Sequence, residues 1–291
     1  MRRRQPSLGA GQRGVALLLV LWAGTVLAIM LGGYVVLART EGLQARYQFA
    51  QTQAHYAAEA GIMRAVYQLQ DPQVRHRWIG DGRVYAFSWD NAEVKVSAIS
   101  EAGKVDLNSA SPDVLQGLFR ATGMAPAAAQ ALTANVVNWR GSPGSKSQVA
   151  EQRALYAAAG RDYGPRNGPF ASIEELQMVL GMTPSIYRQV ASAITVWSGN
   201  STPDPGTAPP LALAAIPGMT PQKMQAIELA RQAQIDAPSL ALYNGVTHSI
   251  RSEASLADGT RAVVRATIRS QMGLTGAQPY VVLRWREGDG Q

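Results

Sequence analysis

The side chains that most often carry out catalysis are few in this sequence and lie far apart. The three histidines are His55, His76 and His248, and cysteine is absent. The lack of cysteine excludes thiol catalysis, cysteine zinc sites and disulfides. The paired carboxylates of Glu174 and Glu175 lie at an expected helix start, where they complement the helix dipole. Zincin, nucleophile-elbow and Walker motifs are also absent. We therefore predict that the chain is not an enzyme.

Oxygen atoms that could bind a hard cation occur in loops rich in glycine and proline. They belong to Asp162, Asn167, Asn200 and Asp204. Calcium needs six to eight oxygen ligands, and no Asp-x-Asp cluster in these loops supplies such a set. We therefore assign no metal ligand, and we expect the stretch Gly141–Pro169 to be a solvated loop.

The charge of the chain is concentrated at its beginning. The formal net charge is +7, from 27 basic and 20 acidic residues. Four of the basic residues lie within positions 1–14, which contain no acid: Arg2, Arg3, Arg4 and Arg13. Without them, 23 basic residues face 20 acidic ones. The rest of the chain is therefore close to neutral and has no strong electrostatic attraction to nucleic acid backbones.

The segment Val15–Ala38 is long and apolar enough to span a membrane. It has 24 residues without a charge and is followed by Arg39 and Glu41. A spanning helix needs about 20 apolar residues, whereas a secretory signal has a shorter apolar core and a small-residue cleavage site. The basic residues before it keep the N-terminus in the cytoplasm. A simple single-pass anchor is the alternative to a processed signal.

The helix is expected to continue beyond the membrane. Apolar or small residues recur in steps of three and four, which places them on one stripe. They are Leu43, Tyr47, Ala50, Ala54, Ala57, Gly61, Ala65 and Leu69. Pro72 should end the helix, so that Val15–Asp71 forms a rod of roughly 85 Å. We expect its second half to pack on the chain's own globular part and His55 to be exposed.

Two blocks of alternating residues predict strands. They are Arg83–Trp89 and Glu93–Ser100, then Thr247–Leu256, Thr260–Gln271 and Tyr280–Arg286. Asp258 and Gly259 suit a hairpin turn. The five strands should form one antiparallel sheet packed on the long helix, which predicts an α+β fold.

The middle block, about Asp106 to Ile235, shows no strand signal and is expected to be helical. Three similar turns occur in it, at Gly123–Pro126, Gly181–Pro184 and Gly218–Pro221. In each, glycine closes one helix and proline begins the next. The helical runs that follow are Ala127–Trp139, Ser185–Trp197 and Gln222–Ala233. In the lead-in helix, Ser111 is the expected N-cap and Pro112 the first helical residue.

The junction between leader and helix resembles the class III signal of type IV pilins and type II secretion pseudopilins. The basic leader ends in Arg13-Gly14, and the apolar helix begins directly at Val15. The resemblance implies that a prepilin peptidase cuts between Gly14 and Val15 and methylates the new N-terminus. The apolar helix would then serve both as an anchor and as an assembly element.

The fifth mature residue and the helical insert resemble one type within that family. Pilins normally carry glutamate at this position, where this chain has Leu19. K-type minor pseudopilins lack the glutamate and contain a helical insert, and they are placed at the fibre tip. The resemblance implies minor pseudopilins of the I and J types, the major pseudopilin and prepilin peptidase as partners, and secreted substrate as a further contact. The type also binds calcium in its insert, although no ligand can be assigned here.

The insert also resembles helix-hairpin-helix (SAM-like) repeats, which leaves a second hypothesis. A membrane-tethered receptor for DNA uptake would use backbone N–H groups at Gly-x-Gly-like turns. The third residue of each turn, where a Gly-x-Gly turn has its second glycine, is instead Ala125, Thr183 or Thr220. Lysine and arginine do not cluster at these turns, so no nucleic acid partner is expected.

The expected organisation has six parts. They are a cleaved leader (1–14), a transmembrane helix (15–38), the periplasmic half of the long helix (39–71), the first part of the sheet domain (72–104), the inserted helical domain (105–240) and the second part of the sheet domain (241–291). The chain is expected in the inner membrane as a single-pass protein with its bulk in the periplasm.

Overall fold

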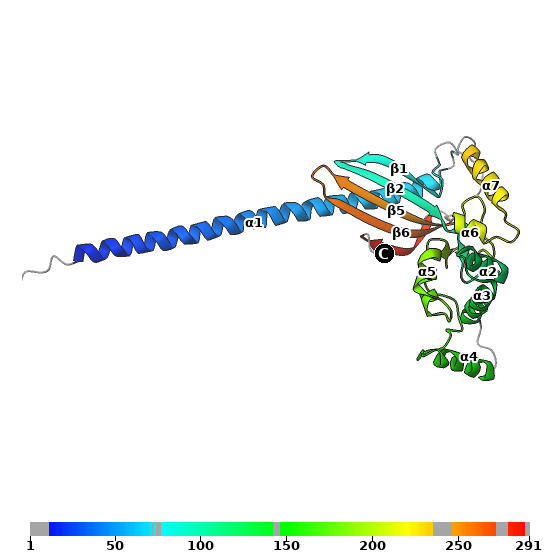
Figure 1. The fold of residues 1–291 in the computed structure, drawn as a ribbon. Coiled ribbons are helices and arrows are strands. Elements are labelled where there is room, and N and C mark those ends of the chain that lie inside the picture. The colour runs from blue at the N-terminus through cyan, green and yellow to red at the C-terminus, as the bar shows by residue number, and fades with distance from the viewer. Residues whose placement is uncertain are drawn as a thin grey trace, which may run out of the picture. The chain divides into compact units, whose positions relative to one another are not determined.

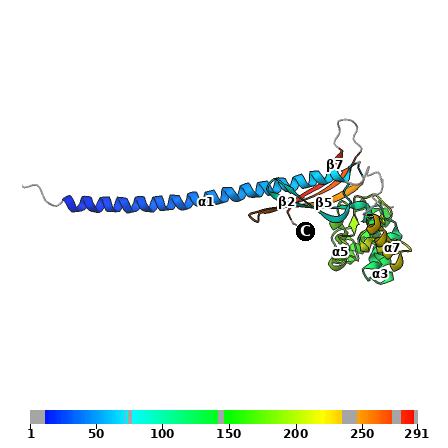
Figure 2. The same ribbon diagram turned by 90° about the horizontal axis from the view of Figure 1, so that it is seen from above.

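The computed structural model describes residues 12–71, 73, 77–141, 146–234, 246–271 and 279–288. The chain divides into two compact units, the first ending at Ala54 and the second beginning at His55. Figures 1 and 2 show the ribbon in two views.

The first unit is dominated by α1 (Gln12–Leu69), a helix of 58 residues that continues into the second unit. Its beginning is uncharged from Val15 to Ala38, and the hydroxyl of Thr25 donates a hydrogen bond to the carbonyl of Trp22 at 2.7 Å. The predicted long helix is thus confirmed, although it ends two residues before Asp71. Pro72, the predicted cause of its end, lies outside the described residues.

The second unit contains the predicted antiparallel sheet, in the order β1-β2-β5-β6-β7. The strands are β1 (Asp81–Trp89), β2 (Ala92–Ser100), β5 (Thr247–Leu256), β6 (Arg261–Ser270) and β7 (Tyr280–Glu287). The turn between β5 and β6 is as predicted. Gly259 has a φ of +88°, and the Asp258 carboxylate accepts a hydrogen bond from the Thr260 N–H at 2.8 Å.

Helix α1 packs on this sheet through small side chains. Ala57, Ala65 and Leu69 are at most 3% exposed and share a core with Val94 and other residues of the strands. The predicted packing is therefore confirmed for this part of the stripe. Leu43 and Tyr47, at the start of the stripe and in the first unit, are about 60% exposed.

Between β2 and β5 the chain forms most of its remaining helices. They are α2 (Pro112–Ala121), α3 (Pro126–Arg140), α4 (Lys146–Ala158), α5 (Pro184–Val190), α6 (Pro210–Ala214) and α7 (Pro221–Gln234). Two 3-10 helices, η1 (Glu101–Gly103) and η2 (Ile173–Met178), lie in the same region. Ser111 caps α2 as predicted, accepting a hydrogen bond from Val114 N–H. Gly123, Gly181 and Gly218 have φ between +73° and +86°.

The expectation that this region is purely helical is wrong, because it also contains a pair of strands. Two short parallel strands, β3 (Val105–Asp106) and β4 (Ile194–Thr195), pair there. The Val105 N–H donates to the Ala193 carbonyl at 2.9 Å, so α5 ends at Val190 instead of continuing to Trp197. These pairings join residues about 90 positions apart, which local periodicity cannot reveal.

The expected solvated loop, Gly141–Pro169, is also wrong in part because it contains α4. Tyr156 of α4 is 4% exposed and lies 6.1 Å from Trp139 between ring centroids. Phe170, just beyond the stretch, stacks on Trp139 at 6.2 Å. Aromatic packing holds this segment against the helical core. Residues 142–145 lie outside the described part of the chain.

Candidate functional site

The first candidate site is the exposed apolar surface of α1. Leu18, Leu19 and Val20 are 61–71% exposed, and none of the most apolar 18-residue window is buried. Among the described residues, α1 is the one helix long and apolar enough to cross a membrane, judged by length and composition. Exposed leucines in water are costly, at about 25 cal/mol per Å². The chain thus has a candidate single-pass membrane anchor.

The predicted cleavage junction lies at the start of the same helix. Gly14 and Val15 are both within α1, and Val15 is 60% exposed. Residues 1–11 of the leader lie outside the described residues. Leu19 is 61% exposed and is flanked by other apolar side chains.

A second exposed surface lies on α1 within the second unit. Tyr56, Met63 and Tyr67 are 63%, 42% and 69% exposed. Their spacing of seven and four residues places them on one helical face, opposite the face of Ala57, Gly61 and Ala65 that packs on the sheet. We call Tyr56, Met63 and Tyr67 the aromatic face. Single exposed apolar residues are common, but three on one face suit contact with another helix.

One buried carboxylate, that of Asp106 in β3, organises the part of the helical region around the short strands β3 and β4. Asp106 is 1% exposed, and one of its oxygens accepts hydrogen bonds from the N–H groups of Asn108 and Ser109 at 2.7 and 3.1 Å. The other accepts from the Ser198 hydroxyl at 3.2 Å and the Gly199 N–H at 2.8 Å. These four bonds satisfy the buried charge. They tie β3 to the segment after β4, which indicates a structural role.

The histidines are not assembled into a site among the described residues. His248 is fully buried in β5, and this burial lowers its pKa to about 4. His55 was expected to be exposed, but it is half-buried, with Nε2 3.4 Å from Glu59 and 3.9 Å from Glu287 of β7. His76 lies outside the described residues. His55 and His248 therefore stand on different elements with different neighbours.

The adjacent acids lie in the first turn of η2, as predicted, but their carboxylates contact specific partners. Glu175 accepts hydrogen bonds from Trp139 Nε1 at 3.0 Å and from Arg166 at 3.2 Å. Glu174 pairs with Arg284 of β7 at 3.3 Å. Carboxylates neutralised in this way are suited to holding elements together, not to acid–base catalysis.

The oxygen-bearing loop residues do not form a calcium site. Within the described ranges, no group of three or more histidine, aspartate or glutamate side chains is placed to hold a metal ion. The amide of Asn167 donates to the Pro165 carbonyl at 3.1 Å, and Asp204 accepts from the Thr207 hydroxyl at 3.0 Å.

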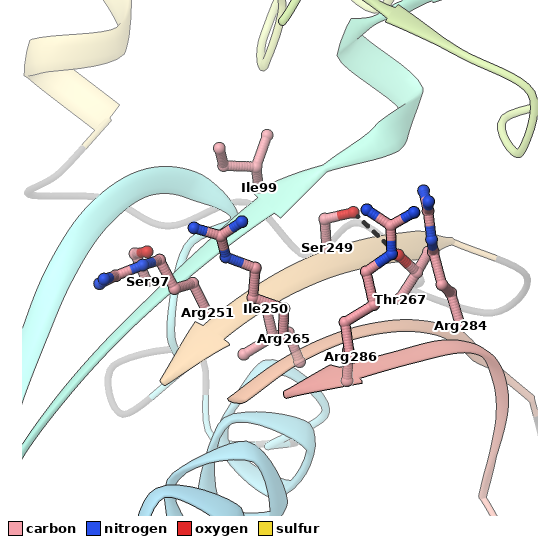
Figure 3. Close-up of a pocket in the computed structure, with 10 residues that line it drawn as sticks. Ser97, Ile99, Ser249, Ile250, Arg251, Arg265, Thr267, Arg284 and Arg286 are labelled. Atoms are coloured by element: carbon pink, nitrogen blue, oxygen red, sulfur yellow. Dashed lines mark hydrogen bonds between the residues drawn. The ribbon is translucent and has the colours of Figure 1, made fainter. Parts of the chain in front are cut away.

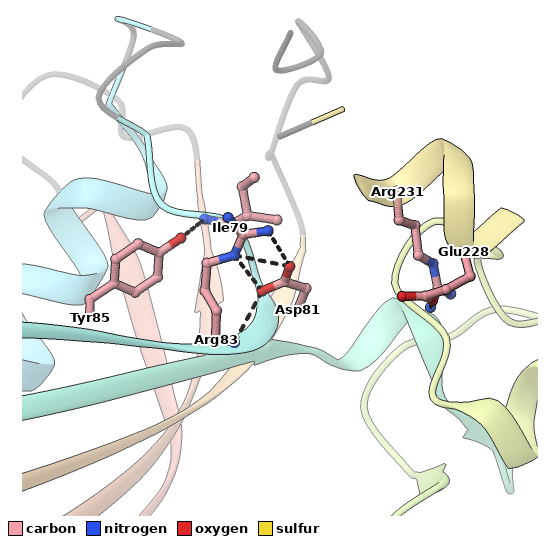
Figure 4. Close-up of polar contacts among 6 residues, drawn as sticks. All are labelled: Ile79, Asp81, Arg83, Tyr85, Glu228 and Arg231. Atoms are coloured by element: carbon pink, nitrogen blue, oxygen red, sulfur yellow. Dashed lines mark hydrogen bonds and ion pairs between the residues drawn. The ribbon is translucent and has the colours of Figure 1, made fainter. Parts of the chain in front are cut away.

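A cation already contacts the loop that contains Asp204. The Arg231 guanidinium of α7 donates to the Pro205 carbonyl and, at 2.7 Å, to the Ala208 carbonyl. Figure 4 shows Arg231 beside Glu228, from which it is 3.5 Å away. Two carbonyl oxygens of this loop thus accept hydrogen bonds from an arginine. Asp162 and Asn200 add no further carboxylate cluster, so the described residues do not fit the ion.

At two of the three Gly–Pro turns, the nearby basic side chain binds a carbonyl of its own turn or helix. At the third turn, the Lys223 ammonium donates to the Gly218 carbonyl of its own turn at 3.0 Å. At the second, the Arg188 side chain donates to the Pro184 carbonyl at 3.3 Å. Basic groups engaged with local carbonyls do not form the stripe expected of a nucleic acid surface.

One feature was missed by sequence analysis, a cationic cavity on the sheet. It has a volume of about 300 Å³ and is lined by four arginines, Arg251, Arg265, Arg284 and Arg286. Figure 3 shows them on neighbouring strands around Ser249 and Thr267, whose hydroxyls are hydrogen-bonded at 3.2 Å. The sequence has arginines at alternate positions of β7. The pairing of the strands β5, β6 and β7 is what brings all four arginines together.

Comparison with known proteins agrees with the expected family. Residues 93–199, from β2 to just beyond β4, match the family model described as type II secretion system (T2SS), protein K. The comparison with curated proteins gave no match.

Among solved structures, the fold is similar to one chain of the crystal structure of the GspK-GspI-GspJ complex from the enterotoxigenic Escherichia coli type 2 secretion system. The TM-score is 0.57 at 14% identity, covering 85% of this chain and all of that one. The long apolar helix and antiparallel sheet are thus shared features. Residues 93–199, which match the protein K family, thus lie within a fold that is similar to that chain.

Proposed function

We propose that this protein is a minor pseudopilin of a type II secretion system that caps the tip of a periplasmic pseudopilus and helps to initiate its assembly for protein export across the outer membrane. In this role, the chain is anchored by residues 15–38 in the inner membrane, and its bulk lies in the periplasm. It transmits force and contacts partners without chemistry of its own. The observation that carries the proposal is Leu19, an apolar residue at the position where pilins normally carry a glutamate.

The argument from Leu19 is electrostatic. A glutamate inside the bilayer costs at least about 2.5 kcal/mol unless a neighbouring charge compensates it. In pilins, the compensating charge is the terminal amine of the adjacent subunit, freed by cleavage between Gly14 and Val15. A subunit at the tip has no such neighbour above it. Leucine removes the cost, and the exposure of the neighbouring Leu18 and Val20 supports a position in lipid.

The helical region supports the same position. The chain leaves the sheet after β2 and returns at β5, and residues 101–246 intervene. We propose that residues 105–240 form an inserted domain, which could be accommodated at a fibre end but would obstruct neighbours along a shaft. The match to a chain of the GspK-GspI-GspJ complex also supports this proposal.

We further propose that the aromatic face of α1 contacts the helices of I-type and J-type minor pseudopilins. The major pseudopilin and prepilin peptidase are additional proposed partners. Pull-down with residues 39–291 should recover the I and J proteins. Tyr56→Ser combined with Tyr67→Ser should weaken recovery at least tenfold, whereas Trp89→Ser, at a 51% exposed aromatic residue of β1, should not. A clean monomer in the presence of both proteins would refute the assignment of partners.

The tip position itself is tested at Leu19. Leu19→Glu should reduce secretion or impair control of fibre length, because its carboxylate would have no partner amine. Leu19→Ala should behave as the wild type. Mass spectrometry should find Val15 as the methylated N-terminus in all three proteins. Equal wild-type secretion for both variants would contradict the tip proposal, and an intact Met1 would contradict the proposed processing.

A further inference from the structure

The two flanks of α1 beside its aromatic face differ in polarity. On the flank toward β1, the exposed Arg64 guanidinium lies 4.2 Å from the centre of the Phe87 ring. On the flank toward β7, the Tyr280 hydroxyl donates to the Met63 sulfur at 3.3 Å. A guanidinium loses hydration when an apolar partner covers it. The flank toward β7 is therefore the better extension of the aromatic face.

Strand β7 adds an exposed apolar side chain on this flank. Val282 is paired in register with Ile268, which is fully buried in the core that α1 shares with the sheet. Residues opposite one another on paired strands point to the same face, so Val282 faces the side of α1, and it is 43% exposed. We call Tyr56, Met63, Tyr67, Tyr280 and Val282 the α1–β7 surface.

The spacing along α1 suits a second helix. With Ala60 included, the aromatic face runs Tyr56, Ala60, Met63 and Tyr67, in steps of four, three and four. This is the spacing of a coiled-coil seam, and it extends for about 16 Å along the helix. Because β7 is the last strand in the order of the sheet, a helix on this seam can also cover its edge.

Two carboxylates beside the surface give it a negative charge. Glu59 of α1 and Glu287 of β7 both contact the His55 imidazole, at 3.4 and 3.9 Å, and their side chains are 34% and 65% exposed. Among the ion pairs of the described residues, these are the ones that the two carboxylates form. One imidazole balances at most one of them, even when it is protonated. A basic side chain of a partner would complement the other.

We propose that the α1–β7 surface binds an amphipathic helix of a partner protein that carries a lysine or arginine next to its apolar stripe. The stripe covers Met63 and Val282, and the cation pairs with Glu59 or Glu287. Apolar burial supplies most of the affinity, whereas the charge pair fixes the position of the helix. The inference rests on the proposed function, because it specifies on which side of α1 the partner helix lies.

The test compares two adjacent valines in pull-downs of the I and J proteins by the full-length protein in detergent. Val282→Glu should lower recovery roughly tenfold, because its carboxylate would be buried without a partner. Val281→Glu is the matched control, since Val281 is 40% exposed but is paired with Arg269 and points to the opposite face. It should recover both proteins as the wild type does.

The charged part of the surface is tested by salt. Glu59→Gln combined with Glu287→Gln should lower recovery roughly two- to fivefold at low salt, as expected for exposed ion pairs. Recovery by the wild type should fall as salt rises, and recovery by the double variant should fall less. An equal salt dependence of the two would overturn the assignment of a basic residue to the partner.

Photo-crosslinking gives a second measurement that does not depend on a charged substitution. Because the chain has no cysteine, Val282→Cys and Val281→Cys can each be labelled at one position with a benzophenone maleimide. The label at position 282 should crosslink to the I or J protein, and the label at position 281 should not. The Tm values of Val282→Glu and Val281→Glu should differ by less than about 2 °C, as expected for exposed positions.

The outcomes separate this inference from the proposed function. If the wild type recovers neither protein, both the assignment of partners and this surface are wrong. If the wild type recovers them but Val282→Glu does so equally well, or if positions 281 and 282 crosslink equally, the inference alone is overturned. The partner helix would then contact α1 away from β7.

Discussion

The second unit contains two hydrophobic cores, and their buried side chains differ in size. Where α1 meets the sheet, seven of the fifteen described buried residues are alanines, including Ala57, Ala58, Ala65, Ala98 and Ala254, and the other eight are valine, leucine or isoleucine. The core of the helical region contains large side chains instead. Among them are Leu115, Leu118, Phe119, Trp139, Tyr156 and Phe170.

The difference follows from the geometry of the elements. A helix can approach a sheet closely only when the residues between them are small, and the position of Gly61 illustrates this limit. A Cβ atom there would lie 2.1 Å from Ser252 Oγ and 2.9 Å from Val94 Cγ1. Short helices joined by turns have wider gaps between them, which large side chains must fill. One core should therefore be sensitive to lost atoms and the other to added atoms.

The largest effect is expected from removing atoms in the helical region. Phe119 of α2 is fully buried. Phe119→Ala should lower the free energy of unfolding by about 4 kcal/mol, because it loses transfer energy and leaves a cavity. Ala58→Gly in the other core should cost about 1 kcal/mol. Chemical denaturation would measure both, and a cost below about 1.5 kcal/mol for Phe119→Ala would contradict the tight packing.

The next largest effect is a dependence of stability on pH that arises from His248 in β5. His248 is buried and paired in register with Ser100 of β2, and burial lowers its pKa from 6.5 to about 4. Its neutral form is favoured in the folded state, so its contribution to stability is complete above pH 6.5. Below that pH the unfolded chain binds the proton first, and stability falls by up to about 3 kcal/mol down to pH 4.

This dependence is measured by comparing variants across that range. His248→Gln cannot take up the proton, so its stability relative to the wild type should rise as the pH falls from 7.5 to 4.5. His55→Gln is the control, because His55 is half-buried at a different site and should leave the pH slope in place. A constant difference between wild type and His248→Gln would show that the histidine is not held neutral.

The same contrast explains which parts of the fold could be predicted from sequence. The strands and the turn at Asp258-Gly259 follow from alternation and local turn chemistry, and both are confirmed. The β3–β4 pair depends on contacts between residues about 90 positions apart, and α4 is held by Tyr156 against Trp139. Neither contact leaves a local pattern in the sequence.

Among the candidate sites, those whose residues are contiguous in sequence could be predicted, and the one that depends on strand pairing could not. The apolar anchor and the junction at Gly14 and Val15 are contiguous in sequence, so they could be proposed at once. The arginine cavity could not, since Arg251, Arg265 and Arg286 become neighbours only through strand register.

A smaller effect is expected from adding atoms to the core of α1 and the sheet. Gly61→Ala gains about 1 kcal/mol of helix propensity, but its Cβ would overlap Ser252 and Val94. Overpacking typically costs 1–3 kcal/mol, so a net loss of about 0–2 kcal/mol is expected in chemical denaturation. Gly42→Ala is the control on the same helix, with nothing within 4 Å of the added atom. Stabilisation by Gly61→Ala would mean that helix and sheet lie further apart.

The smallest effect should come from Glu174, whose carboxylate joins η2 to β7. Its pairs with Arg284 and Arg286 are 3.3 and 3.8 Å long, and all three side chains are about a third or more exposed. Such exposed pairs contribute about 0–1 kcal/mol. The helical region is also held to the sheet by less exposed bonds, such as the one from the Thr247 hydroxyl to the Trp197 carbonyl at 3.3 Å. Glu174→Gln should therefore change the unfolding free energy by less than about 1 kcal/mol, and less still at high salt. A loss above about 2 kcal/mol that salt does not reduce would show that this carboxylate, rather than hydrogen bonds such as that of Thr247, holds the two cores together.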